Sequence, residues 1–145
     1  MTYLAHISED HRRQTVLEHL EGMAELCGRF AMPFGAEELG RLTGLAHDIG
    51  KYSDAFQRRL QGGERVDHAT AGAYECLRQG QPVAAFCIAG HHGGLSDGGH
   101  QEDSPDLPTL WGRINRAGGG KQLRATENWD MPVIVTTAVQ FFGSL

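Results

Sequence analysis

The dipeptide His47-Asp48 stands out because four further histidines, widely spaced along the chain, offer the same kind of donor atom. They are His19 upstream and His68, His91 and His92 downstream. One carboxylate with five imidazoles is a set of metal ligands, and it suits zinc, iron, nickel, cobalt or manganese. A divalent metal held by such a set would polarise a phosphoryl oxygen or generate a hydroxide nucleophile. The sequence therefore predicts a metal site that contains Asp48.

Each of these residues also has an ordinary structural explanation. A lone histidine on an apolar helix face usually forms a hydrogen bond within the core, and His91-His92 would suit the negative end of a helix dipole. The joint pattern favours the metal, because three histidine-bearing sites are expected at or beside helix ends and His19 on an inward face. Asp48 has two oxygens and can bridge two metals about 3.5 to 4 Å apart. Lys51 would either neutralise a phosphate oxygen or be an ordinary exposed lysine.

Apolar residues recur at helical spacing through most of the chain, and this pattern predicts the elements that position the site. Helices are expected over residues 15–31, 36–47, 54–60, 67–78, 83–92 and 110–116, with a loop over residues 93–108. Thr15 and Glu18 form a capping-box signature, and Ser53 is the candidate N-cap of the third helix. The predicted fold class is all-α, a helical bundle with the metal site between helices.

Composition narrows the class of protein. A length of 145 residues with a hydrophobic fraction of 40% predicts one soluble globular domain. No apolar run approaches the roughly 18 to 20 residues of a membrane span, and the first residues lack a signal-peptide pattern. We therefore expect a cytoplasmic protein with no membrane partner. Cysteines are odd in number, lie in apolar contexts and form no CxxC, so we expect buried reduced thiols at Cys27, Cys76 and Cys87.

Charge bears on nucleic-acid binding. The formal net charge of −5 argues against a broad surface that binds nucleic acid. Charge is local, however, and the arginine clusters would either touch phosphates or form solvated surface. These clusters are Arg12-Arg13, Arg58-Arg59, and Arg113, Arg116, Lys121 and Arg124.

Three short sequence motifs around the predicted ligands resemble motifs of a known protein family. They are Gly44-Leu45-Ala46-His47-Asp48-Ile49-Gly50-Lys51, Val66-Asp67-His68-Ala69-Thr70-Ala71-Gly72-Ala73 and Ile88-Ala89-Gly90-His91-His92-Gly93-Gly94-Leu95. The order of the ligands resembles the HD phosphohydrolase superfamily, an all-helical metal-dependent fold. The three motifs resemble those of the HD nuclease domain of CRISPR-associated type I nuclease-helicases, and the resemblance covers about residues 1–117.

The resemblance implies a nuclease that cleaves single-stranded DNA on divalent transition metals (Mn, Ni, Co, Fe or Zn), with one or two ions per chain. By position, His19, His47 and Asp48 match the ligands of one metal. The ligands of the other metal are matched by Asp48, His68, His91 and His92. Lys51 matches a lysine beside the site, and we expect Asp48 and Lys51 to take part in catalysis. The implied partners are single-stranded DNA, a CRISPR surveillance complex and a helicase part supplied elsewhere.

The C-terminal residues have a different character. Residues 133–137 are rich in β-branched side chains and are strand-like, and residues 127–145 resemble a strand-helix segment of the helicase part of the same family. We therefore divide the chain into an HD nuclease domain, truncated at its C-terminal side, over residues 1–117, a flexible junction over 118–126 and a helicase-like remnant over 127–145. The sequence contains no GxxxxGK[ST] motif, which predicts that there is no ATP site.

One feature of the family has no counterpart after His92, namely a later helix whose aspartate helps to close the first metal position. We therefore expect the second position, built on His68, His91 and His92, to be better formed than the first. Two other functions stay open. One is a stand-alone HD phosphohydrolase that acts on nucleotides, and the other is a non-catalytic remnant that keeps the fold.

Overall fold

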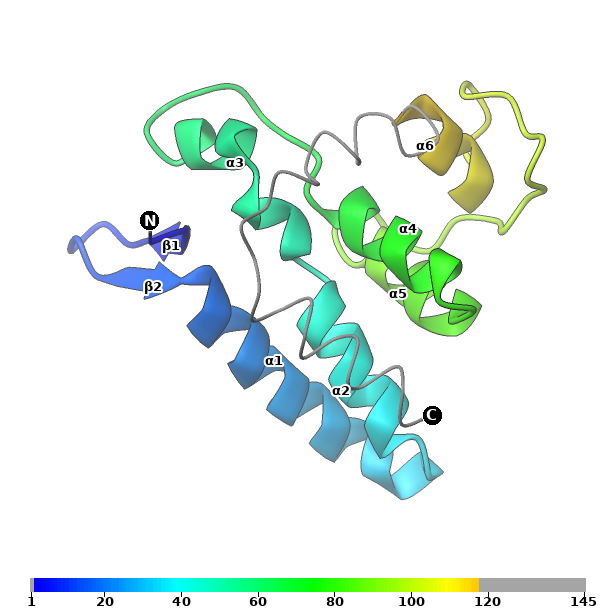
Figure 1. Cartoon of the computed structure of the whole chain (residues 1–145), viewed down its shortest axis with the longest axis horizontal. Coiled ribbons are helices and arrows are strands. Elements are labelled where there is room, and N and C mark those ends of the chain that lie inside the picture. Colours follow the sequence, from blue (N-terminus) through cyan, green and yellow to red (C-terminus); the bar gives the residue numbers. More distant parts are fainter. Residues whose placement is uncertain (1, 118–145) are drawn as a thin grey trace.

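The computed structural model describes residues 2–117, and in this part of the chain a short β-hairpin leads into a bundle of helices (Figure 1). The elements are β1 (Leu4–Ile7), β2 (Arg13–Thr15), α1 (Val16–Ala31), the 3-10 helix η1 (Met32–Phe34), α2 (Glu37–Ala46), the 3-10 helix η2 (Ile49–Tyr52), α3 (Asp54–Arg59), α4 (Ala69–Arg78), α5 (Pro82–Gly90) and α6 (Leu110–Arg116). The predicted all-α bundle is confirmed over these residues. The predicted junction 118–126, the strand-like residues 133–137 and the remnant 127–145 lie outside the described residues.

Helices α1 and α2 run side by side in opposite directions (Figure 1). The predicted capping box starts α1, because Glu18 N donates to Thr15 Oγ1 at 3.2 Å and Thr15 N donates to Glu18 Oε2 at 2.9 Å. Gly35, in the left-handed region with φ 68°, ends η1 and turns the chain into α2. Close packing of the pair depends on Gly44, where a Cβ atom would lie 2.5 Å from the Met23 carbonyl oxygen.

Helices α4 and α5 form a second pair, and α6 packs against α4 (Figure 1). The main core lies where these helices meet α2. Its largest completely buried side chains are Leu42, Cys76, Ile88 and Ile114. Small residues allow the crossing of α2 and α4, since a Cβ atom on Gly72 would lie 2.0 Å from the Ala46 carbonyl oxygen. The C-terminal end of α2 is thereby held against the start of α4.

The β-hairpin was not predicted. Strands β1 and β2 pair antiparallel, with Leu4 opposite Thr15 and Ile7 opposite Arg13. The strands are too short for the alternation of apolar and polar residues to be distinguished from a loop. Ala5 nevertheless belongs to a second buried cluster with Val16, Leu20 and Tyr52. The hairpin therefore packs on the start of α1 and on η2, close to the predicted ligands.

Three smaller expectations also need correction. Helix α5 ends at Gly90, two residues earlier than predicted, and His68 is the N-cap of α4 instead of a first-turn residue. Of the cysteines, Cys76 is buried, Cys27 is partly buried and Cys87 is exposed. Helix α5 is apolar on all sides, so some of its apolar side chains must face away from the core, and Cys87 is one of them. Among residues 2–117, no helix is both long and apolar enough to cross a membrane.

Candidate metal centre

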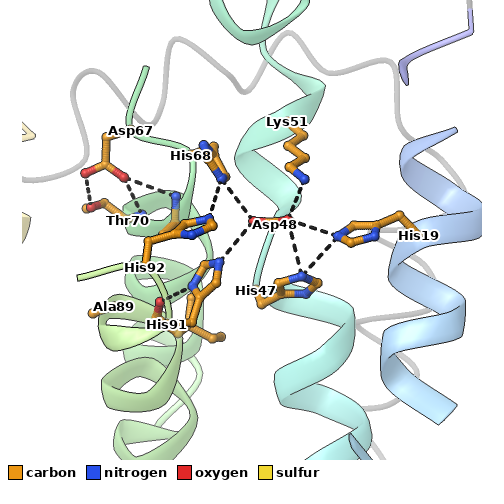
Figure 2. A network of polar contacts seen from close by, with 12 residues as sticks. His19, His47, Asp48, Lys51, Asp67, His68, Thr70, Ala89, His91 and His92 are labelled. Carbon is orange, nitrogen blue, oxygen red and sulfur yellow. Dashed lines mark hydrogen bonds and ion pairs between the residues drawn. The ribbon is translucent and has the colours of Figure 1, made fainter. Parts of the chain in front are cut away.

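Asp48 lies at the point where the backbone leaves α2. The helix ends at Ala46 and His47 is its C-cap, whereas Asp48 has the non-helical dihedrals φ −124° and ψ 22°. This departure frees His47 and Asp48 from the angular spacing of consecutive helical residues, so both side chains reach the same point. The Asp48 residue is only 2% exposed. Figure 2 shows its carboxylate between two sets of side chains.

One carboxylate oxygen, Asp48 Oδ2, faces the α1 side. It lies 3.0 Å from His19 Nε2 and 3.2 Å from His47 Nε2. The ammonium group of Lys51 lies 2.8 Å from the same oxygen, and Lys51 is only 4% exposed. The exposed lysine that the sequence left open is therefore excluded, and Lys51 is a buried partner of the Asp48 carboxylate.

The other oxygen, Asp48 Oδ1, faces the α4 and α5 side (Figure 2). It lies 3.3 Å from His68 Nε2 and 3.4 Å from His91 Nε2. It is buried and has no hydrogen-bond partner among the described residues. A buried carboxylate oxygen left without a donor is costly. The position therefore fits a cation that would lie between Oδ1 and these imidazoles.

Three of the rings are oriented by backbone carbonyls. His47 Nδ1 lies 2.7 Å from Gly44 O, and His91 Nδ1 lies 2.7 Å from Ile88 O. His68 Nδ1 lies 3.2 Å from Val66 O. A carbonyl oxygen can only accept a hydrogen bond, so the proton of each neutral ring is on Nδ1 and the lone pair is on Nε2. This is the orientation that metal-ligating histidines usually have.

The Nε2 atoms also face one another. His19 Nε2 lies 3.2 Å from His47 Nε2, and His68 Nε2 lies 2.9 Å from His92 Nε2. The nitrogens of His47 and His68 carry lone pairs, so close approach to several further acceptors is favourable only if a cation or a proton lies among them. The donor set therefore fits divalent transition metals, which bind imidazole and carboxylate together.

The structure brings all of the predicted ligands into two overlapping groups that share Asp48. One group is His19, His47 and Asp48, and the other is Asp48, His68, His91 and His92. Within each group the donor atoms lie within 4.8 Å of one another. The second group offers four donors and the first offers three. That the second position is the better formed stays a prediction.

A family comparison identifies this architecture. The model of the HD domain matches residues 16–125, which is most of the chain. The chain belongs to the HD domain family. A segment of 81 residues is also 40% identical to Ribonuclease Y of Syntrophobacter fumaroxidans (strain DSM 10017 / MPOB). That alignment covers 54% of this chain and 14% of Ribonuclease Y, so the chain matches only a small part of that protein.

Electrostatics in the HD domain keep the shared carboxylate ionised. Burial alone would raise the pKa of Asp48, but contacts with His19, His47, His91 and Lys51 outweigh burial and hold the pKa far below its ordinary value. Asp48 is therefore an anion at every pH at which the domain would work. Members of this family are metal-dependent phosphohydrolases, and a permanently charged carboxylate suits a metal ligand.

The imidazoles differ in how readily they take a proton. Burial lowers the pKa of His68, so its ring is neutral near pH 7 and free to donate to a metal. Contact with the Asp48 carboxylate raises the pKa of His91 in spite of burial. A proton therefore competes with a metal more strongly at His91 than at His68.

One neighbour of the HD site was missed in the sequence. His6, which is not among the predicted ligands, is exposed, but its Nε2 lies 3.2 Å from Lys51 Nζ. Its ring centroid lies 4.9 Å from that of His19. Strand β1 brings His6 there, and because the hairpin was not predicted, no pattern in the sequence pointed to this contact.

Proposed function

We propose that the chain is a metal-dependent HD nuclease that cleaves phosphodiester bonds of single-stranded DNA in CRISPR type I interference. The observation that carries the proposal is the Asp48 carboxylate, whose two oxygens face two separate sets of imidazoles while Oδ1 has no hydrogen-bond partner among the described residues. The three sequence motifs around His47, His68 and His91 support the CRISPR context, with a surveillance complex and a helicase part as partners.

Each residue has a defined task in this proposal. His19, His47 and Asp48 would hold one metal, and the second group of four would hold another. Divalent metals bound there would supply Lewis acidity towards a phosphoryl oxygen and a lowered pKa of water. Lys51 balances the charge of Asp48 and donates to Nε2 of the exposed His6. In this proposal the remaining N–H of Lys51 would donate to a phosphate oxygen.

Cationic side chains next to the site support a nucleic-acid substrate. The Arg59 guanidinium lies 5.6 Å from the centroid of the Phe56 ring, and the Phe56 ring lies 5.1 Å from that of His68. Arg58 and Arg65 are exposed in the same stretch of chain. An arginine beside the metal ligands is suited to a phosphate of a strand that passes over them.

RNA is a second candidate substrate. The specific observation in its favour is the 40% identity over 81 residues to a protein named Ribonuclease Y. DNA and RNA strands present the same phosphodiester group to the metals, so the centre itself does not discriminate between them. A nucleotide, in contrast, would need a pocket for its base beside Asp48.

The test is an activity and metal assay on the purified chain. After chelation it is reloaded with Mn, Co, Ni, Fe, Zn or Mg and given single-stranded DNA, single-stranded RNA or nucleotides. We expect cleavage of DNA by the parent chain and complete loss in Asp48→Ala, together with loss of bound metal. Asp106→Ala, which removes an exposed loop carboxylate, is the matched control and should behave like the parent.

The other outcomes separate the alternatives. Cleavage of RNA without DNA would establish a ribonuclease, and hydrolysis of nucleotides alone would establish a nucleotide phosphohydrolase. If the parent and Asp48→Ala are equally inactive with every metal, the nuclease proposal fails and the chain is a non-catalytic remnant.

A further inference from the structure

Arg113 connects three helices on the far side of the second group of ligands. It belongs to α6, yet its Nε donates to Thr70 Oγ1 of α4 at 2.7 Å. Its Nη2 donates to both oxygens of Asp67 at 3.1 Å. Its Nη1 donates to the carbonyl oxygen of Ala89 in the last turn of α5. One guanidinium thus binds the start of α4 and the end of α5 together.

One set of hydrogen bonds from Arg113 reaches Asp67, the residue before His68. Asp67 accepts hydrogen bonds from Ala69 N and Thr70 N, each at 3.1 Å, and from Thr70 Oγ1 at 2.5 Å. The carboxylate of Asp67 therefore satisfies the free amides at the start of α4, although His68 occupies the N-cap position and makes no side-chain cap bond. Fixing Asp67 fixes the backbone from which His68 projects towards Asp48.

Another hydrogen bond from Arg113 reaches the carbonyl oxygen of Ala89, two residues before His91. The last carbonyls of a helix have no partner within it, and Arg113 supplies one for Ala89 O. The neighbouring carbonyl, Ile88 O, orients the His91 ring. Arg113 therefore holds the backbone that carries His91 and His92 from outside the site. Inside the site, Asp48 Oδ1 faces the His91 ring (Figure 2).

Within residues 2–117, the first group of ligands has no comparable contact with Arg113. His19 is on α1 and His47 ends α2, whereas the hydrogen bonds of Arg113 go to Asp67, Thr70 and Ala89. A change at Arg113 should therefore affect one half of the centre and spare the other half. Asp48 itself is held by η2 and by Lys51.

We infer that Arg113 is a positioning residue that sets the spacing of His68 relative to His91 and His92, and so sets the affinity of the second metal position. The inference rests on the metal centre proposed above. The Arg113 and Asp67 side chains are 30% and 49% exposed. An ion pair that exposed contributes little to overall stability, so the value of the contact lies in the geometry of the ligands.

The test compares Arg113→Met and Arg113→Lys with Arg116→Met. Arg116 is on the same helix, and its side chain donates to Pro105 O at 2.9 Å, away from the ligands, so it is the matched control. Binding of Mn²⁺ to the chelated chains is measured by calorimetry and equilibrium dialysis. His92→Ala and His19→Ala assign the two classes of site.

We expect Arg113→Met to lower the Mn²⁺ affinity of one class of site, the class that is lost in His92→Ala. The expected decrease is about tenfold to a hundredfold, as loss of outer-shell contacts commonly causes. The class that His19→Ala removes should keep its affinity. Arg113→Lys keeps the charge but cannot reach all three acceptors, so its loss should be smaller. Arg116→Met should match the parent.

Equal weakening of both classes, or of neither, would overturn the inference and leave the metal centre intact. A parent chain that binds no metal would refute the proposed centre itself. A parent that binds only the class removed by His19→Ala would also overturn the inference, because the second position would not exist. If Arg113→Met does not fold, as judged by circular dichroism, Arg113→Lys is the test. A decrease in Mn²⁺ affinity confined to the class lost in His92→Ala would then support the inference, and an unchanged affinity would overturn it.

Discussion

Lys51 is the residue that allows Asp48 to stay charged inside the domain before any metal arrives. The pair is almost completely buried, with Lys51 Nζ 2.8 Å from Asp48 Oδ2. Two roles follow from this position, one as countercharge and one as neighbour of a phosphate. The roles can be separated, because a metal can replace an ammonium group as countercharge but cannot replace a hydrogen-bond donor to substrate.

Lys51→Met should lower the stability of the metal-free domain by about 3 to 5 kcal/mol, since it removes the buried ammonium group that neutralises the Asp48 carboxylate. Metal should bind more tightly in this variant, because the repulsion between the ammonium and the cation is gone. Urea denaturation with EDTA and with Mn²⁺ measures both effects. Arg29→Met, which removes an exposed cation from the last turn of α1, serves as the control and should change neither. Weaker metal binding in Lys51→Met would contradict this role.

The candidate ligands could be predicted from the sequence, because the joint pattern of imidazoles and a carboxylate at expected helix ends favours a metal, although each residue alone has an ordinary structural explanation. The same residues could not predict the position of Lys51 or of His6. Burial of a lysine is decided by the carboxylate packed against it, and His6 comes close to the site only through a hairpin of three- and four-residue strands. The role of Arg113 depended on three tertiary contacts that leave no local pattern.

Among the elements, helix ends and glycines decide where the ligands meet. Gly50 passes so close to the start of α4 that a Cβ atom would lie 2.2 Å from His68 O, and Gly72 is as close to Ala46 O at 2.0 Å. The missing side chains let the end of α2 and the start of α4 touch, which brings His68 to Asp48. Capping signals predicted α1 and α3 well, whereas these close approaches depend on packing.

Gly72→Ala should destabilise the domain by about 1 to 3 kcal/mol, because its methyl group meets backbone that cannot rotate away. It should also weaken the second metal position by moving His68 from Asp48. The control is Gly22→Ala on the exposed face of α1, where a Cβ atom meets nothing within 4 Å. This change should stabilise the domain by roughly 0.5 to 1 kcal/mol. Denaturation curves that move in the same direction for both variants would show that helix propensity alone explains them.

At the scale of the whole molecule, the centre collects side chains from α1, the end of α2, the start of α4 and the segment after α5. These segments are distant in the sequence, so an unfolded chain has no preformed site. Any metal that binds the folded domain therefore stabilises the entire fold through mass action.

Cysteine labelling can measure this linkage. Burial raises the pKa of Cys76 to about 12, so its thiol should react with iodoacetamide only when the core opens, whereas the exposed Cys87 should react at once. Mn²⁺ at a hundred times its dissociation constant should slow labelling of Cys76 by about a hundredfold and leave Cys87 unchanged. Peptide mapping by mass spectrometry follows each thiol separately. Rapid labelling of Cys76 in the metal-loaded domain would contradict a link between metal binding and the stability of the core.

The two groups of ligands also lie at different depths. The side chains of His19, His47 and His68 are 14%, 11% and 13% exposed, whereas that of His91 is 25% exposed and His92 is an exposed residue. A metal in the second group would therefore meet solvent on the side of His91 and His92, while a metal in the first group would be surrounded by side chains that are all largely buried. We expect the HD centre to exchange an ion of the second group faster than an ion of the first, so the first ion would be the more persistent of the two.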